Sequence, residues 1–125
     1  LPYEDEFFDC TIDRGSLTCN RKVDIPPLLT ELRRVMKPGG KLFSMILNEA
    51  CSAWKDATAL GDNDYENFSG RLKDAGILHF TNGEEAAELF SDFQIEDIEI
   101  LLRKSEYPPA ENTSVTAWSL ITCHK

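Results

Sequence analysis

The residues best placed to do chemistry stand together at Asp13-Arg14-Gly15-Ser16, directly after a short run of strand-forming residues. A carboxylate can orient a reacting group or accept its proton, and a guanidinium can bind an anionic group. Gly15 allows close approach to the backbone, and the Ser16 hydroxyl can donate a hydrogen bond. Asp13 is therefore our candidate catalytic residue. The alternative is that Asp13 and Arg14 form a tight turn and an exposed ion pair.

A second pair of candidates, Asn48 and Glu49, follows the apolar run LFSMIL at residues 42–47. In sheets of parallel strands, ligands bind beyond the carboxyl ends of the strands. We therefore expect Asn48 and Glu49 to contact a substrate. An exposed loop without a ligand explains these two residues equally well.

The elements that must position these candidates form a parallel crossover unit. Residues 7–13 alternate as a strand does, and residues 42–47 have the composition of a strand that is buried on both faces. Between them, apolar side chains recur at helical spacing over residues 25–36, and Asp24 is the expected capping residue. Pro38-Gly39-Gly40 is expected to end this helix. A strand, a helix and a strand in this order predict two parallel strands.

The least regular stretch covers residues 48–80, where glycine, aspartate and asparagine are scattered among apolar residues. We expect a partly helical insertion here. Trp54 and Tyr65 would shape a lid over a substrate. The alternative is that these aromatic side chains form only the local core of the insertion.

The last part of the chain is expected to close the sheet with an antiparallel hairpin. Thr81 or Asn82 can cap a helix whose apolar side chains, including Ala87, pack on the sheet. Residues 93–103 and 115–123 alternate as strands do, with a slip at Asp97 that indicates a bulge. The polar loop at residues 107–112 is too short for a crossover helix, so the two strands are expected to be antiparallel neighbours.

Composition limits the classes of partner. A chain of 125 residues can form one small domain with a core. Its formal charge of −9, from 13 basic and 22 acidic residues, argues against binding to nucleic acid, because such binding depends on clustered Lys and Arg. The apolar runs reach only about half of the roughly 20 residues that span a bilayer. We expect a soluble protein with a small-molecule substrate, no nucleic-acid partner and no membrane contact.

The cysteines and histidines indicate neither disulfides nor a metal site. The four cysteines show no C-x-x-C spacing, so we expect reduced thiols in a cytoplasmic protein. His79 and His124 have no partner at the spacing of metal ligands. We expect both histidines to occupy ordinary polar positions.

Two motifs carry a family resemblance: LPYEDEFFDCT at residues 1–11 and RVMKPGG at residues 34–40. They resemble the carboxyl-terminal half of class I S-adenosylmethionine-dependent methyltransferases that act on small molecules. The resemblance implies an α/β fold that contains the fourth to seventh strands of a Rossmann-like sheet, with the last strand antiparallel between two others. It also implies that S-adenosylmethionine is bound by four consecutive residues, Arg14, Gly15, Ser16 and Leu17.

The resemblance covers only the second half of such an enzyme. The 125 residues contain no E/D-x-G-x-G-x-G loop, which in the family holds the amino-acid end of the cofactor. Methyl transfer to an unidentified small molecule is therefore expected to need an amino-terminal half that precedes Leu1. Without that half, the fourth strand has a free edge, and we expect a homodimer to form through it.

Two other functions compete with methyl transfer. One is a non-catalytic methyltransferase-like module that serves as a binding or scaffold subunit. The other is a nicotinamide-dependent dehydrogenase, which also has a doubly wound sheet. The closing antiparallel hairpin and the RVMKPGG turn disfavour the dehydrogenase.

Overall fold

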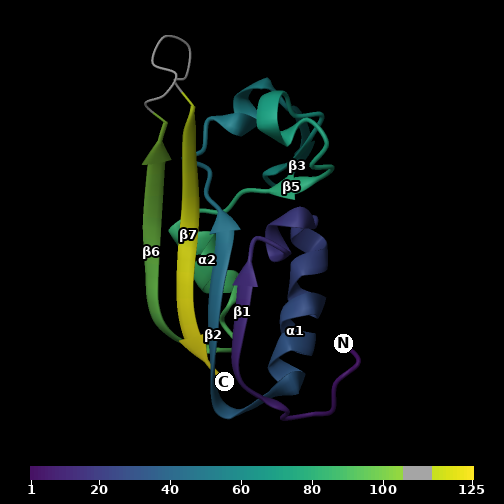
Figure 1. Ribbon diagram of the computed structural model, residues 1–125, viewed down its shortest axis with the longest axis vertical. Helices are drawn as coiled ribbons and strands as arrows, with labels where there is room; N and C mark the ends of the chain where they lie inside the picture. The colour runs from purple at the N-terminus through teal and green to yellow at the C-terminus, as the bar shows by residue number, and fades with distance from the viewer. Residues whose placement is uncertain (106–113) are drawn as a thin grey trace.

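The computed structural model describes residues 1–105 and 114–125, which form a four-stranded sheet, a smaller sheet and two helices (Figure 1). Along the chain, the strands and helices are β1 (Phe8–Arg14), α1 (Ile25–Val35), β2 (Met36–Leu47), β3 (Thr58–Gly61), β4 (Asp64–Glu66), β5 (Leu78–His79), α2 (Gly83–Leu89), β6 (Gln94–Lys104) and β7 (Val115–His124). Short 3-10 turns lie between them at η1 (Leu17–Cys19), η2 (Lys22–Asp24), η3 (Ala53–Asp56) and η4 (Gly70–Leu72).

The larger sheet has the strand order β1-β2-β7-β6. β1 and β2 are parallel, and β7 is antiparallel to both of its neighbours, β2 and β6. The predicted crossover unit, the closing hairpin and the α/β fold class are therefore confirmed. The predicted loop at residues 107–112 lies outside the described residues.

The start of α1 and the start of β2 differ from the predictions. Asp24 stands at the N-cap position of α1, but its side chain makes no capping hydrogen bond, because η2 leads directly into the helix. β2 already begins at Met36, so Pro38-Gly39-Gly40 lies within a strand instead of only ending the helix.

Gly40 allows the close approach of β1 to β2. A Cβ atom at Gly40 would lie 2.9 Å from the carbonyl oxygen of Lys37 and 3.2 Å from those of Phe8 and Asp9. Side-chain atoms do not fit at such distances, so only glycine suits this position. Pro38-Gly39-Gly40 therefore allows β1 and β2 to pair, in addition to following the end of the helix.

The second helix and the last hairpin agree with the sequence in most details. Of the two predicted caps of α2, the one used is Asn82, whose side chain accepts a hydrogen bond from the backbone N–H of Glu85 at 2.9 Å. The bulge in β6 is confirmed, and its extra residue is Glu96, because the register shifts between Ile95 and Asp97. Ala87 was expected to face inward but is exposed, since the short helix buries only one side.

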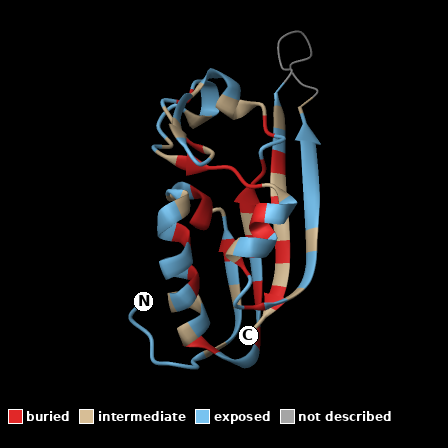
Figure 2. Ribbon diagram, turned by 180° about the vertical axis from the view of Figure 1, so that it is seen from behind, coloured by how far each residue is buried: buried red, intermediate tan, exposed pale blue. Residues whose placement is uncertain are grey.

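Both helices cover the same face of the sheet, and the main core lies beneath them (Figure 2). On the opposite face, the strand register pairs Ile12 with Phe43, Met45 with Leu120 and Leu47 with Trp118. No helix of residues 1–105 or 114–125 covers this face, which we call the open face. Ile12 and Phe43 are 74% and 41% exposed there.

Residues 48–80, where a partly helical insertion was expected, contain more strand than the prediction and only short 3-10 helices. They contain the antiparallel sheet β3-β4-β5 and the turns η3 and η4. Asp62 and Asn63, between β3 and β4, have φ values of 55° and 61°. Asp and Asn tolerate this left-handed conformation better than most residues, so they can form the tight hairpin turn.

The four cysteines are free thiols. Cys10 and Cys19 are exposed, whereas Cys51 and Cys123 are buried. Burial raises the pKa of Cys51, and it raises the pKa of Cys123 to about 11. The two buried thiols therefore stay protonated near neutral pH and are poor nucleophiles.

None of the described helices is long and apolar enough to cross a membrane.

Candidate functional site

The turn after β1 is organised around the carboxylate of Asp13. This side chain is only 5% exposed, and its Oδ1 accepts hydrogen bonds from the backbone N–H groups of Ser16 and Leu17, at 2.9 and 3.2 Å, and from the Ser16 hydroxyl. Its Oδ2 accepts a fourth hydrogen bond, at 2.7 Å, from the hydroxyl of Ser44 on β2. Both oxygens of the carboxylate are therefore bound within the fold, Oδ1 by three donors of the turn and Oδ2 by Ser44.

The other predicted cofactor contacts differ in what they offer a ligand. The side chain of Leu17 is in the main core, and the hydroxyl of Ser16 is held by Asp13. Arg14 is exposed, and strand alternation places it on the open face with Ile12. Gly15 has a φ of +84°, and a Cβ atom there would lie 3.5 Å from the Trp118 ring. Within this turn, Arg14 and Ser16 are exposed and Gly15 is partly exposed, whereas Leu17 is buried.

Asn48 and Glu49 take different positions at the end of β2. Asn48 is 5% exposed; its Nδ2 donates to the Ser119 hydroxyl at 3.0 Å, and its Oδ1 accepts from the backbone N–H of Ala50 at 2.9 Å. Glu49 is exposed, and its carboxylate accepts a hydrogen bond from Asn63 at 3.2 Å. The Asn48 amide is therefore hydrogen-bonded within the fold, whereas the Glu49 side chain lies at the surface.

Trp54 and Tyr65 pack against a second apolar cluster, which joins side chains of residues 51–80 to Leu47 on β2 and Ala117 on β7. Their ring centroids are 5.8 Å apart, and the Tyr65 ring meets Phe80 edge-on at 5.6 Å. The indole N–H of Trp54 donates to the backbone oxygen of Glu49 at 2.7 Å. These contacts agree with the alternative interpretation, in which the two aromatic side chains form a local core.

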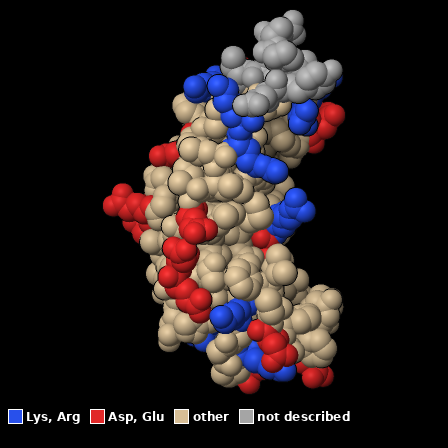
Figure 3. Space-filling view, turned by 60° about the vertical axis from the view of Figure 1, so that its left-hand side comes forward, with Lys and Arg blue, Asp and Glu red and all other residues tan. Residues whose placement is uncertain are grey.

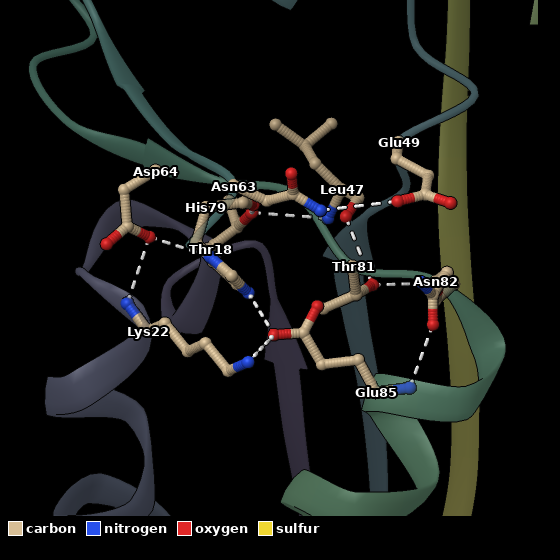
Figure 4. Close-up of polar contacts among 11 residues, drawn as sticks. Thr18, Lys22, Leu47, Glu49, Asn63, Asp64, His79, Thr81, Asn82 and Glu85 are labelled. Carbon is tan, nitrogen blue, oxygen red and sulfur yellow. Dashed lines mark hydrogen bonds and ion pairs between the residues drawn. The ribbon is translucent and has the colours of Figure 1, made fainter. Parts of the chain in front are cut away.

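A buried polar network next to the turn was not predicted from the sequence (Figure 4). His79 on β5 has no exposed surface; its Nδ1 lies 2.7 Å from Asp64 Oδ1 on β4, and its Nε2 lies 3.1 Å from Glu85 Oε1 on α2. Lys22 Nζ lies 3.0 Å from the same Glu85 oxygen, and the hydrogen bond to Glu85 is the main cause of the raised pKa of Lys22. Four elements, η2, β4, β5 and α2, meet at this network.

Thr18 connects this network to the turn after β1. The hydroxyl of Thr18, in η1, donates to the backbone oxygen of His79 at 2.6 Å and accepts from the backbone N–H of Leu47 at 3.2 Å. Thr18 follows directly after Leu17, which is anchored by Asp13. The turn is therefore fixed at one end by Asp13 and at the other by the histidine network.

Among the described residues, no group of three or more His, Cys, Asp or Glu side chains could hold a metal ion. His124, the second histidine of the chain, lies at the surface between Glu96 and Gln94.

Comparison with known proteins places this arrangement in a recognised fold. No protein-family model matches the sequence, and no curated protein matches it. A solved S-adenosylmethionine-dependent methyltransferase from Methanosarcina mazei matches 100% of the chain, with a TM-score of 0.72 and 16% identity. The chain has a methyltransferase fold. The predicted resemblance to class I enzymes is thus confirmed at the level of the fold.

Two further structures share the methyltransferase fold. One is the Burkholderia thailandensis 1,6-didemethyltoxoflavin-N1-methyltransferase, solved with 1,6-didemethyltoxoflavin and S-adenosylhomocysteine bound; it matches 97% of the chain, with a TM-score of 0.65 and 15% identity. The other is a possible histamine N-methyltransferase from Thermotoga maritima, which matches 100% of the chain, with a TM-score of 0.58 and 20% identity. The chain spans 62% of the length of the Methanosarcina protein, 45% of the Burkholderia protein and 59% of the Thermotoga protein.

The Trp118 ring lies close to Gly15, because a Cβ atom there would be 3.5 Å from two ring carbons, an ordinary van der Waals distance. Arg14, the residue before Gly15, is exposed on the open face.

Proposed function

We propose that this chain is the carboxyl-terminal part of an S-adenosylmethionine-dependent methyltransferase that acts on a small molecule. The observation that carries the proposal is the sheet order β1-β2-β7-β6 with an antiparallel β7, in a chain that matches solved methyltransferases over 97–100% of its length. Because it spans only 45–62% of those structures, we also propose that an amino-terminal half completes the cofactor site.

In this proposal, S-adenosylmethionine supplies a methyl group on a positively charged sulfur, and the protein aligns the acceptor with it. The residues Arg14 to Leu17 form one side of the cofactor site, with Gly15 closest to the ligand. Asp13 acts as a positioning residue, because its carboxylate already accepts hydrogen bonds from three donors of the turn and from Ser44 on β2. Glu49, exposed beyond the end of β2, remains our candidate for a substrate contact, and residues 48–80 border the substrate site.

Calorimetric titration of S-adenosylhomocysteine tests this function. We would titrate the 125-residue chain and, in parallel, a longer protein expressed from the complete reading frame. Binding to the longer protein, with weaker or no binding to the chain, supports the proposal. Equal affinities would overturn the need for an amino-terminal half. Absence of binding to both would overturn the enzyme and leave the non-catalytic module.

The role of Gly15 gives a sharper prediction. Gly15→Ala in the longer protein should weaken S-adenosylhomocysteine binding about tenfold, because forcing alanine into a left-handed conformation costs about 1–2 kcal/mol and moves the turn. Gly76→Ala is the matched control, since Gly76 has a similar φ of +72° and lies in the insertion between η4 and β5. Equal losses in both variants, measured by the same calorimetry, would show that the turn has no special role.

The free edge of β1 supports a proposed homodimer. β1 is at the end of the four-stranded sheet, so one side of the strand has no partner strand among the described residues. Such edges pair readily with other chains. We expect light scattering on the 125-residue chain to give twice the monomer mass at high concentration; a monomer throughout would contradict this proposal.

A non-catalytic binding module is the second candidate. This candidate is favoured because the side chains of Asp13 and Asn48, two of the predicted site residues, form hydrogen bonds within the fold. The same titrations separate the two candidates.

A further inference from the structure

A cleft of about 760 Å³ opens between the insertion and the ends of the last hairpin. Its walls come from η3 and η4 on one side and from the end of β6 and the start of β7 on the other. Volumes of roughly 300–1,000 Å³ are typical of sites for small molecules. The cleft is separate from the buried network around His79, which contributes none of its lining residues.

The charge in this cleft is opposite to that of the chain as a whole. Among the described residues that line it are Arg71, Arg103 and Lys104, against a single carboxylate, that of Asp56. In Figure 3, blue side chains gather beneath the grey atoms, whereas red side chains follow the middle of the same face. In a chain with a net charge of −9, this local excess of cations attracts anions to one place.

The three cations are not neutralised by the fold that the structure describes. None of the ion pairs within residues 1–105 and 114–125 includes Arg71, Arg103 or Lys104. All three side chains are exposed. Their N–H groups can therefore form charge-assisted hydrogen bonds with a ligand.

Trp118 links the cationic end of the cleft to the turn after β1. Its half-buried indole lines the cleft, and the same ring lies 3.5 Å from the position of a Cβ atom at Gly15. The indole face is an apolar surface on which a flat ring can stack. Arg103 and Trp118 both line the cleft, so a ring on Trp118 can carry an anionic group toward the cations.

We propose that this cleft binds a small aromatic molecule that carries an anionic group, a carboxylate or a phosphate. Arg71, Arg103 and Lys104 hold the anion, and Trp118 carries the ring. The identification of this molecule as the methyl acceptor rests on the proposed function. The binding of the anion does not, since it depends only on the described residues of the cleft.

Nuclear magnetic resonance of the 125-residue chain tests the proposal through its indole N–H signals. The chain has two tryptophans, Trp54 and Trp118, so a Trp54→Phe variant assigns both signals. The probes are benzoate, phenyl phosphate and benzamide, which has the shape of benzoate but no charge. We expect at least one anion to shift the Trp118 signal at a concentration about tenfold lower than benzamide requires. The stronger of the two anions identifies the carboxylate or the phosphate.

Substitutions in the cleft provide the second readout. Arg103→Gln and Lys104→Gln should each weaken binding of the preferred anion about tenfold, because each removes a charge-assisted hydrogen bond. Lys73→Gln is the matched control, since Lys73 is an exposed cation next to η4 that does not line the cleft. All three positions are exposed, and the dispersion of the spectrum reports whether each variant is folded. Equal binding of benzamide and both anions, or equal losses in all three variants, would overturn the proposal.

The results of this experiment and of the S-adenosylhomocysteine titration test the two proposals separately. Anion binding at Trp118 in a protein that does not bind S-adenosylhomocysteine would keep the cleft and reject the methyltransferase. S-adenosylhomocysteine binding without an effect of either anion on Trp118 would reject the cleft alone.

Discussion

Replacement of His79 by alanine is expected to lower the free energy of unfolding by about 3–5 kcal/mol. The imidazole has no exposed surface and contacts Asp64 at 2.7 Å and Glu85 at 3.1 Å. Its removal takes one hydrogen-bond partner from each of two buried carboxylates, which keep their contacts with Lys22, and opens a cavity where the ring was. Urea unfolding of the 125-residue chain, followed by circular dichroism, measures the loss.

His124→Ala is the matched control for this prediction. His124 also lies between two side-chain oxygens, with Glu96 at 3.1 Å and Gln94 at 2.9 Å, but it is at the surface. Water can replace the lost contacts there, so we expect little change in stability. Equal losses in the two variants would show that the buried network adds nothing beyond ordinary surface contacts.

Asp13→Ala is expected to cost about 2–3 kcal/mol, because it leaves buried donors of the turn without an acceptor. The backbone N–H of Leu17 and the hydroxyl of Ser44 both depend on this carboxylate. Asp9→Ala is the control on the same strand, since Asp9 is exposed and its carboxylate pairs with Lys37 at the surface. Thermal unfolding of both variants gives the comparison.

A second measurement separates positioning from direct catalysis by Asp13. In the longer protein, a positioning role predicts that Asp13→Ala weakens S-adenosylhomocysteine binding together with stability, because the turn loosens. If Asp13 takes a proton from the acceptor, turnover should fall while binding and the melting temperature stay normal. That result would contradict the role we assign and restore Asp13 as the catalytic residue.

The sequence predicts the first crossover unit well because its signals are local. The helical spacing of Ile25 and Leu29, and the run LFSMIL, are properties of neighbouring residues that tertiary contacts reinforce. The start of β2 at Met36 could not be predicted in this way. It depends on how closely β1 approaches Gly40, which only the folded sheet determines.

One pair of residues in the insertion does predict its small sheet, but the scattered polar residues around that pair favour a loop. Asp62-Asn63 between two short strands is typical of a tight hairpin turn, because both residues tolerate positive φ. The adjacent glycine and acidic residues made the same stretch resemble an irregular loop.

The candidate site is harder to predict than the fold. Asp13 and Asn48 are polar residues at the ends of strands, where ligands bind, and nothing in the sequence shows that their side chains turn into the fold. The partners of His79 lie on β4 and α2, so no fixed spacing marks the network. Its only local sign is a histidine within the apolar stretch ILHF.

The position of β7 also determines when the sheet can form. β7 joins β2 to β6, and its contacts with β2 connect residues about as far apart as Asn48 and Ser119, which are 71 positions from each other. On a translating ribosome, β1 and β2 are made long before their neighbour, and β6 has no partner in this sheet until residues 115–124 leave the exit tunnel. Non-local pairing of this kind is slow. The sheet is therefore completed only after residues 115–124 have been made, and until then β6 and one edge of β2 lack their partner strand.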